Sequence, residues 1–134
     1  KSSCILDEVP KGFPPLLKSF KMQKKASKKG FDWDKIEDVK AKITEEFREA
    51  EEARIKDDKK ALESEIGDLL FAVVNYARHL GVNPDVALNI TNEKFYRRFS
   101  YVQQKMEEAG EEMLPGKLEL MDKFWNEAKT NEKK

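Results

Sequence analysis

The chain carries two short acidic patterns whose spacing could do chemistry, Glu45-Glu46-x-x-Glu49 and Glu65-x-x-Asp68. Residues three apart are neighbours on a helix, so each pattern places a pair of carboxylates on one side of its helix. If the two helices faced each other, like charges at roughly 5 Å would repel by about 3 kcal/mol per pair at an effective dielectric near 20. Such a cluster needs a divalent cation or raised pKa values, and oxygen ligands without histidine or cysteine favour Mg²⁺, with Mn²⁺ as a substitute. The pattern therefore predicts a magnesium site that accepts a phosphate substrate.

The elements that must position these carboxylates are helices. Proline and glycine divide the chain into segments rich in helix formers. No stretch shows the sustained alternation of a strand bounded by hairpin turns. The expected helices cover residues 14–30, 34–56, 59–80, 83–108 and 117–129. The sequence therefore predicts an all-α fold, a helical bundle of about five helices, with the acidic patterns on the second and third.

The length of the chain and the positions of its proline and glycine residues indicate one domain. The 134 residues are enough for a single hydrophobic core. We expect the domain at residues 14–130, after a linker or N-terminal extension at 1–13 and before a frayed charged tail at 131–134. Because the chain begins at Lys1 rather than with methionine, we expect it to have been either trimmed or cut from a longer protein.

Composition restricts the partners and the compartment. Twenty-six basic residues balance twenty-six acidic residues, which argues against a general attraction to nucleic acid. The longest strongly apolar run, Leu69 to Val74, is far shorter than the roughly 20 residues of a membrane helix, so we expect no membrane partner. The single cysteine, Cys4, excludes an intramolecular disulfide and fits a reducing compartment. The cytoplasm is the expected location.

The third expected helix is apolar over much of its circumference. One broad face holds Leu62, Ile66, Leu69, Leu70, Val73, Ala77 and Leu80. A helix of this kind in so small a chain is expected to be buried from several sides. The pattern therefore predicts a homodimer or higher homo-oligomer built around this helix.

Acidic runs on helices are more often solvated faces than metal sites, so the position of these carboxylates matters. Glu46 and Glu49 lie at the edge of the apolar face of their helix, with Lys42 between them. The pair on the third helix borders its apolar arc in the same way, with Asn75 on the same edge. Carboxylates at the rim of a core are costly to desolvate unless they are paired or bound to metal, which favours the metal site.

Other candidate residues are basic or aromatic. Lys94 and Arg98 lie four apart on one helix face, either as a solvated basic edge or as a clamp for a polyphosphate. Trp33 and Trp125 are either packing aromatics or platforms for a nucleobase. His79, the sole histidine, has no partner at metal-site spacing and is interpreted as a surface or packing residue.

Four longer stretches and one connector carry a family resemblance: Glu45-Glu46-Phe47-Arg48-Glu49, Glu65-Ile66-Gly67-Asp68-Leu69-Leu70-Phe71, Asn75-x-Ala77-Arg78-His79-Leu80-Gly81, Asn92-Glu93-Lys94-Phe95-x-Arg97-Arg98-Phe99 and Gly30-Phe31-Asp32-Trp33. Together they resemble the MazG nucleoside triphosphate pyrophosphohydrolases over nearly the whole chain. The resemblance is greatest to the C-terminal, catalytic half of two-domain MazG proteins. The acidic motif alone is shared with dimeric dUTPases, dCTP pyrophosphatases and phosphoribosyl-ATP pyrophosphatases, so it indicates only the superfamily.

The resemblance implies a dimeric helical subunit that binds magnesium and hydrolyses a nucleoside triphosphate to the monophosphate and diphosphate, by water attack at the α-phosphorus. By position, it implies metal ligands at Glu46, Glu49, Glu65 and Asp68, reaction-centre residues at Lys42 and Glu45, phosphate contacts at Lys94 and Arg98, and substrate contacts at Trp125 and Asn75. Glu45 is the candidate that orients or deprotonates the water, and Trp33 is a further candidate for a base contact. A house-cleaning role rests on family analogy alone.

Two other functions fit the same residues. One is a narrow pyrophosphatase for a dCTP-type, dUTP-type or modified nucleotide. The other is a non-catalytic helical interaction module whose acidic face binds a basic partner. The interaction-module hypothesis predicts no metal-dependent turnover, and it predicts that carboxylate-to-amide substitutions leave the function intact. The enzyme hypotheses predict metal-dependent turnover that these substitutions abolish.

Overall fold

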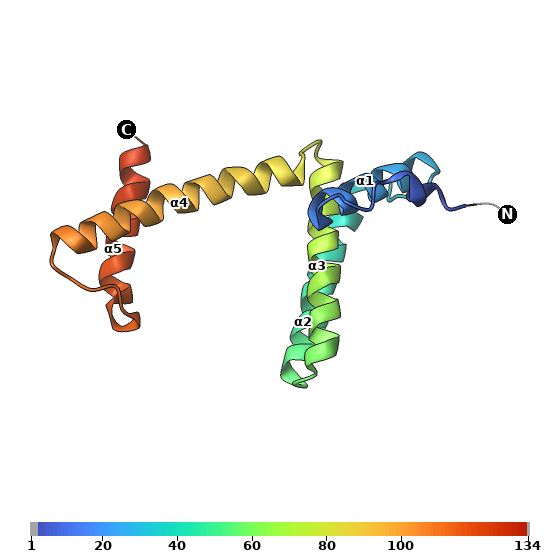
Figure 1. Cartoon of the computed structure of the whole chain (residues 1–134). Coiled ribbons are helices and arrows are strands. Elements are labelled where there is room, and N and C mark those ends of the chain that lie inside the picture. The colour runs from blue at the N-terminus through green and yellow to red at the C-terminus, as the bar shows by residue number, and fades with distance from the viewer. Residues whose placement is uncertain (1–2, 134) are drawn as a thin grey trace. The chain divides into compact units, whose positions relative to one another are not determined.

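A computed structural model describes residues 3–133, which form five α-helices and two short 3₁₀ helices without any strand (Figure 1). In chain order these are η1 (Ile5–Glu8), α1 (Pro15–Lys28), α2 (Ile36–Ile55), α3 (Lys59–His79), α4 (Pro84–Glu108), η2 (Pro115–Lys117) and α5 (Leu118–Glu132). The predicted all-α class is confirmed. The chain divides into two compact units, Lys1–Ala87 and Leu88–Lys134, which are described separately.

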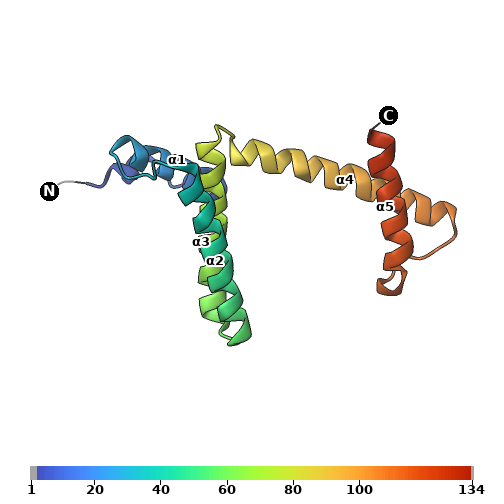
Figure 2. The same ribbon diagram turned by 180° about the vertical axis from the view of Figure 1, so that it is seen from behind.

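The first unit is built on the pair α2 and α3. The two helices lie side by side and run in opposite directions in both views (Figures 1 and 2). They are joined by a tight turn in which Asp57 has a left-handed backbone (φ 56°), and the next residue, Asp58, caps α3 by accepting a hydrogen bond from the Ala61 amide at 3.1 Å. Small buried side chains, among them Ala50 and Ala72, let helices approach closely.

The helix α1 packs against α3 on one side and contacts η1 on another. The Gln23 amide donates to the Phe71 carbonyl oxygen of α3 at 2.9 Å. On the other side, Lys25 of α1 forms an ion pair with Glu8 of η1 at 2.7 Å. The segment 1–13, expected as a linker or extension, thus contains a short helix held against α1, and its Val9 is buried.

The second unit packs the C-terminal part of α4 against α5, which crosses it in both views (Figures 1 and 2). The rings of Phe95 and Trp125 lie 5.4 Å apart between centroids. Tyr101 donates a hydrogen bond to Glu127 at 2.9 Å. The helix α5 continues to Glu132, three residues beyond its expected end, and that residue accepts a 2.8 Å hydrogen bond from Arg98.

Several large apolar side chains are exposed in the single chain. On α3 they include Leu70, which is 57% exposed, and Val73, and on α2 they include Phe47. The third helix, expected to be buried from several sides, is therefore covered by the other helices of the first unit on only part of its surface. In the described part of the chain, no helix is both long enough and apolar enough to cross a membrane.

Candidate active site

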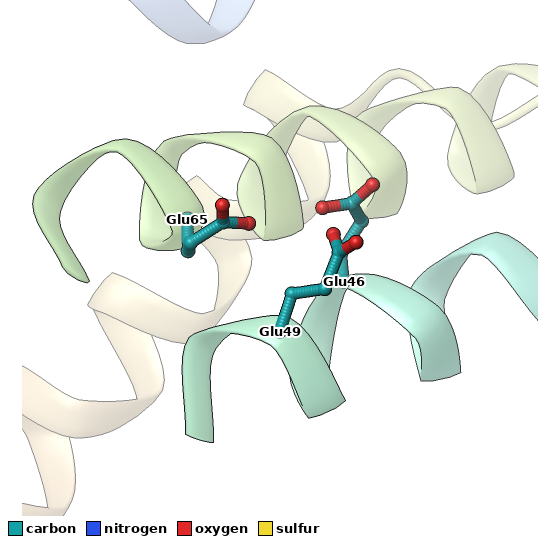
Figure 3. A group of neighbouring side chains, drawn as sticks. All are labelled: Glu46, Glu49 and Glu65. Atoms are coloured by element: carbon teal, nitrogen blue, oxygen red, sulfur yellow. The ribbon is translucent and has the colours of Figure 1, made fainter. Parts of the chain in front are cut away.

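The pairing of α2 with α3 brings three carboxylates together. Glu46 and Glu49 project from adjacent turns of α2, and Glu65 projects from α3 into the space between the helices (Figure 3). One carboxylate oxygen from each lies within 4.8 Å of the other two. The structure thus gathers three of the four carboxylates that were expected to bind metal.

These carboxylates are poorly compensated by the protein. Glu46 is only 5% exposed. Within residues 3–133, Oε2 of Glu46 and Oε2 of Glu65 are buried and accept no hydrogen bond. A buried carboxylate oxygen without a donor is strongly destabilising unless a cation is present. An oxygen-only ligand set with free lone pairs fits Mg²⁺ or Mn²⁺.

Lys42 supplies part of the missing positive charge. Its Nζ lies 3.0 Å from Oε1 of Glu46 and 3.1 Å from Oε2 of Glu45. The hydrogen bonds to Glu46 and then to Glu45 raise the pKa of the Lys42 ammonium, so it stays charged. Lys42 therefore fixes the two carboxylates on either side of it.

Glu49 shows the cost of bringing the carboxylates together. Its hydrogen bond with Glu46, followed by repulsion from that residue and from Glu65, raises the pKa of the Glu49 carboxyl above its ordinary value. The three carboxylates therefore repel one another unless a cation lies between them.

A cavity of about 330 Å³ opens beside the cluster. Its lining includes Lys42 and Glu46 from α2, Asp68 and Asn75 from α3, and Trp33 from the connector before α2. Asp68 lies outside the three-carboxylate group but shares this cavity with Glu46. Glu45 lines a shallower neighbouring hollow, again with Lys42 and Trp33. The first unit thus holds eight of the eleven candidate site residues, and six of them line these two cavities.

A polar network that sequence reasoning missed anchors Trp33 and Asn75. One oxygen of Asp32 accepts hydrogen bonds from Nη2 of Arg78 at 2.7 Å, from Nε2 of His79 at 2.8 Å and from the Trp33 amide at 2.8 Å. Arg78 also donates to Oδ1 of the buried Asn75, from Nε at 3.0 Å and from Nη2 at 2.8 Å. The one available signal was the Gly30-Phe31-Asp32-Trp33 connector, which placed a carboxylate beside Trp33.

The remaining candidates lie in the second unit. The Arg98 guanidinium carbon is 5.7 Å from the centroid of the Trp125 ring, and its Nη2 is 2.8 Å from Glu132. Lys94 lies one helical turn before Arg98 on α4. These three residues, Lys94, Arg98 and Trp125, belong to the second unit, whereas the carboxylates belong to the first. That they meet in one active site stays a prediction.

The fold and the site define an all-α protein with an acidic, cation-compatible centre between two paired helices. Residues 34–103 match the model of the MazG nucleotide pyrophosphohydrolase domain. The chain therefore belongs to the MazG family, as its motifs predicted.

Three relatives show how far the similarity extends. A protein of Escherichia coli K12 named nucleoside triphosphate pyrophosphohydrolase is 42% identical over 95% of this chain and 49% of its own length. A Thermotoga maritima protein named nucleoside triphosphate pyrophosphohydrolase/pyrophosphatase MazG is 38% identical over 96% of this chain and 49% of its own length. Bacillus subtilis YabN, named uncharacterized, is 51% identical over 54% of this chain and 15% of its own length. The chain thus spans about half the length of the first two relatives.

Proposed function

We propose that this chain is a magnesium-dependent nucleoside triphosphate pyrophosphohydrolase, which converts a nucleoside triphosphate and water to the monophosphate and diphosphate. The observation that carries the proposal is the group Glu46, Glu49 and Glu65, in which Oε2 of Glu46 and Oε2 of Glu65 are buried without a donor among the described residues. Membership of the MazG family and the names of the relatives from Escherichia coli and Thermotoga maritima support the reaction class.

In this proposal Glu46, Glu49, Glu65 and Asp68 hold the metal. Magnesium, when bound, supplies charge neutralisation for the triphosphate and Lewis acidity toward oxygen. Lys42 keeps two neighbouring carboxylates in place, because its ammonium lies within 3.1 Å of both Glu45 and Glu46.

The reaction breaks the bond between the α-phosphorus and the oxygen that bridges to the β-phosphorus. Water attacks the α-phosphorus, Glu45 accepts or orients the water proton, and diphosphate leaves with the bridging oxygen. Lys94 and Arg98 offset the charge that develops on the diphosphate. Trp125, Asn75 and Trp33 complete the substrate contacts.

We also propose that the chain works as a homodimer or higher homo-oligomer in the cytoplasm. Exposed apolar side chains such as Leu70 and Val73 lie three residues apart on α3, so they share one side of that helix. Contiguous exposed apolar surface of this kind is typical of a protein interface. A narrow pyrimidine or modified-nucleotide substrate remains the alternative within the same chemistry.

The test is product identification after incubation with each common nucleoside triphosphate, with magnesium and with chelator. Monophosphate and diphosphate formed only with magnesium are the expected products. Nucleoside diphosphate with orthophosphate would contradict the proposed cleavage site. No turnover of any common or modified nucleotide by the folded protein would favour a non-catalytic interaction module.

A further inference from the structure

A second cavity adjoins the carboxylate-lined one in the first unit. It encloses about 210 Å³ between α1, the connector and α3. Trp33, Phe71 and Asn75 line both cavities, so the two share a wall. A ligand whose phosphates lie at the carboxylates therefore has a neighbouring space for another part of the same molecule.

Gln23 gives this cavity a polar group without a partner. The residue is 7% exposed, and its Nε2 donates to the Phe71 carbonyl oxygen at 2.9 Å. Because a carbonyl oxygen only accepts, this bond fixes the orientation of the amide and leaves Oε1 as the free group. Within residues 3–133, Oε1 is buried and has no hydrogen-bond donor. A buried acceptor of this kind is destabilising in the free protein unless it has a role in binding.

The size and lining of the cavity limit the ligand. An apolar cavity of roughly 150 Å³ accommodates a benzene ring, so about 210 Å³ fits one planar ring system and not a whole nucleotide. Phe31, Trp33 and Phe71 provide aromatic surface for such a ring. The wall is held in place from both sides, because Asp32 binds the Trp33 amide and Arg78, and Arg78 binds Asn75.

We infer that this cavity is the nucleobase subsite and that Oε1 of Gln23 accepts a hydrogen bond from an N–H group of the base. The inference rests on the proposed function, since it places the phosphates of the same substrate at the carboxylates. It makes Gln23 a specificity-determining residue, because an amide oxygen selects a ring that presents a donor toward it.

The test compares Gln23→Met, which removes the acceptor and keeps an unbranched side chain, with Gln104→Met at an exposed position as the matched control. The probes are ATP, GTP, CTP and UTP, and inorganic triphosphate, which has no base, all with magnesium. We expect Gln23→Met to weaken binding of the preferred nucleotide by roughly tenfold. Binding of inorganic triphosphate and the midpoint of thermal unfolding should not fall.

Two results would overturn the inference while the proposed function stood. The first is wild-type affinity of Gln23→Met for the preferred nucleotide. The second is equal weakening for that nucleotide and for inorganic triphosphate, which would place the effect at the phosphates or in the fold. If Gln23→Met does not fold, Gln23→Leu provides the same comparison. A folded wild-type protein that binds and hydrolyses no nucleotide would contradict the proposed function, and the inference with it.

Discussion

The carboxylates between α2 and α3 repel one another, and this repulsion acts on Glu49. Its pKa is raised because it faces Glu46 and Glu65. We predict that Glu49→Gln lowers magnesium-dependent turnover by roughly 100-fold or more and, without magnesium, raises the midpoint of thermal unfolding. The exposed Glu52→Gln on the same helix is the control. Loss of both activity and stability would indicate that the carboxylate supports the fold instead of a cation.

The ionised Asp32 carboxylate stabilises the folded protein, and this stabilisation is lost in acid. Burial alone would raise its pKa, but the hydrogen bonds from Arg78, His79 and the Trp33 amide outweigh burial and lower the pKa of Asp32. The folded-state pKa lies below the unfolded value of about 3.9, so this stabilisation is fully present above about pH 4 and is lost as the pH falls through the folded-state pKa.

Substitution of Asp32 should therefore change the pH profile of unfolding. We predict that Asp32→Asn reduces the free energy of unfolding at pH 7 and that its difference from wild type narrows below about pH 4. Urea unfolding across this range, with Asp34→Asn as the control, measures the difference. A difference that stays constant down to pH 2 would show that the charge of Asp32 does not contribute.

The sequence predicted some of the candidate site residues but not others. It identified the carboxylates because their spacing of three is visible within each helix. It missed Gln23 and the role of Asp32, since their partners lie 48 and 46 residues away in the chain and only tertiary packing brings them together. His79 was interpreted as a surface or packing residue, and the structure places its Nε2 2.8 Å from an oxygen of Asp32.

Among the elements, the pair α2 and α3 carries the proposed metal site, because each helix contributes carboxylates to one group. A cation held by both helices binds the folded state and not the unfolded state. We predict that magnesium at 100 times its Kd stabilises the protein by about 2.7 kcal/mol, which corresponds to a rise of roughly 5–15 °C in the unfolding midpoint.

Calorimetry with and without magnesium measures this rise. Glu65→Gln should abolish it, whereas Glu63→Gln, at an exposed position on the same helix, should preserve it. An equal rise in all three proteins would mean that the cation binds elsewhere.

Helix boundaries were predictable where proline, glycine or a capping aspartate marks them. The helix α3 begins at Lys59, as expected, where Asp58 caps it, and α4 begins at Pro84, one residue after its expected start. The short helix Ile5–Glu8 was not predicted, because four residues show no periodicity and the segment is held by the ion pair between Glu8 and Lys25. Elements of this kind depend on contacts that local sequence does not reveal.

For the whole molecule, the exposed apolar side chains predict self-association. We expect the protein to sediment as a dimer or larger assembly at micromolar concentrations, and Leu70→Glu to shift it toward the monomer, because a charge at an apolar interface is costly. Sedimentation velocity over a concentration series is the measurement. A wild-type protein that is monomeric throughout would contradict the proposed assembly.

We propose that the carboxylates between α2 and α3 serve water attack at the α-phosphorus. The most direct test of this proposal is hydrolysis of the preferred nucleoside triphosphate in ¹⁸O-labelled water with magnesium, followed by mass spectrometry of both products. We expect the label to enter the nucleoside monophosphate and not the diphosphate, and folded Glu65→Gln to form almost no product. Label in the diphosphate, or wild-type turnover by Glu65→Gln, would contradict it.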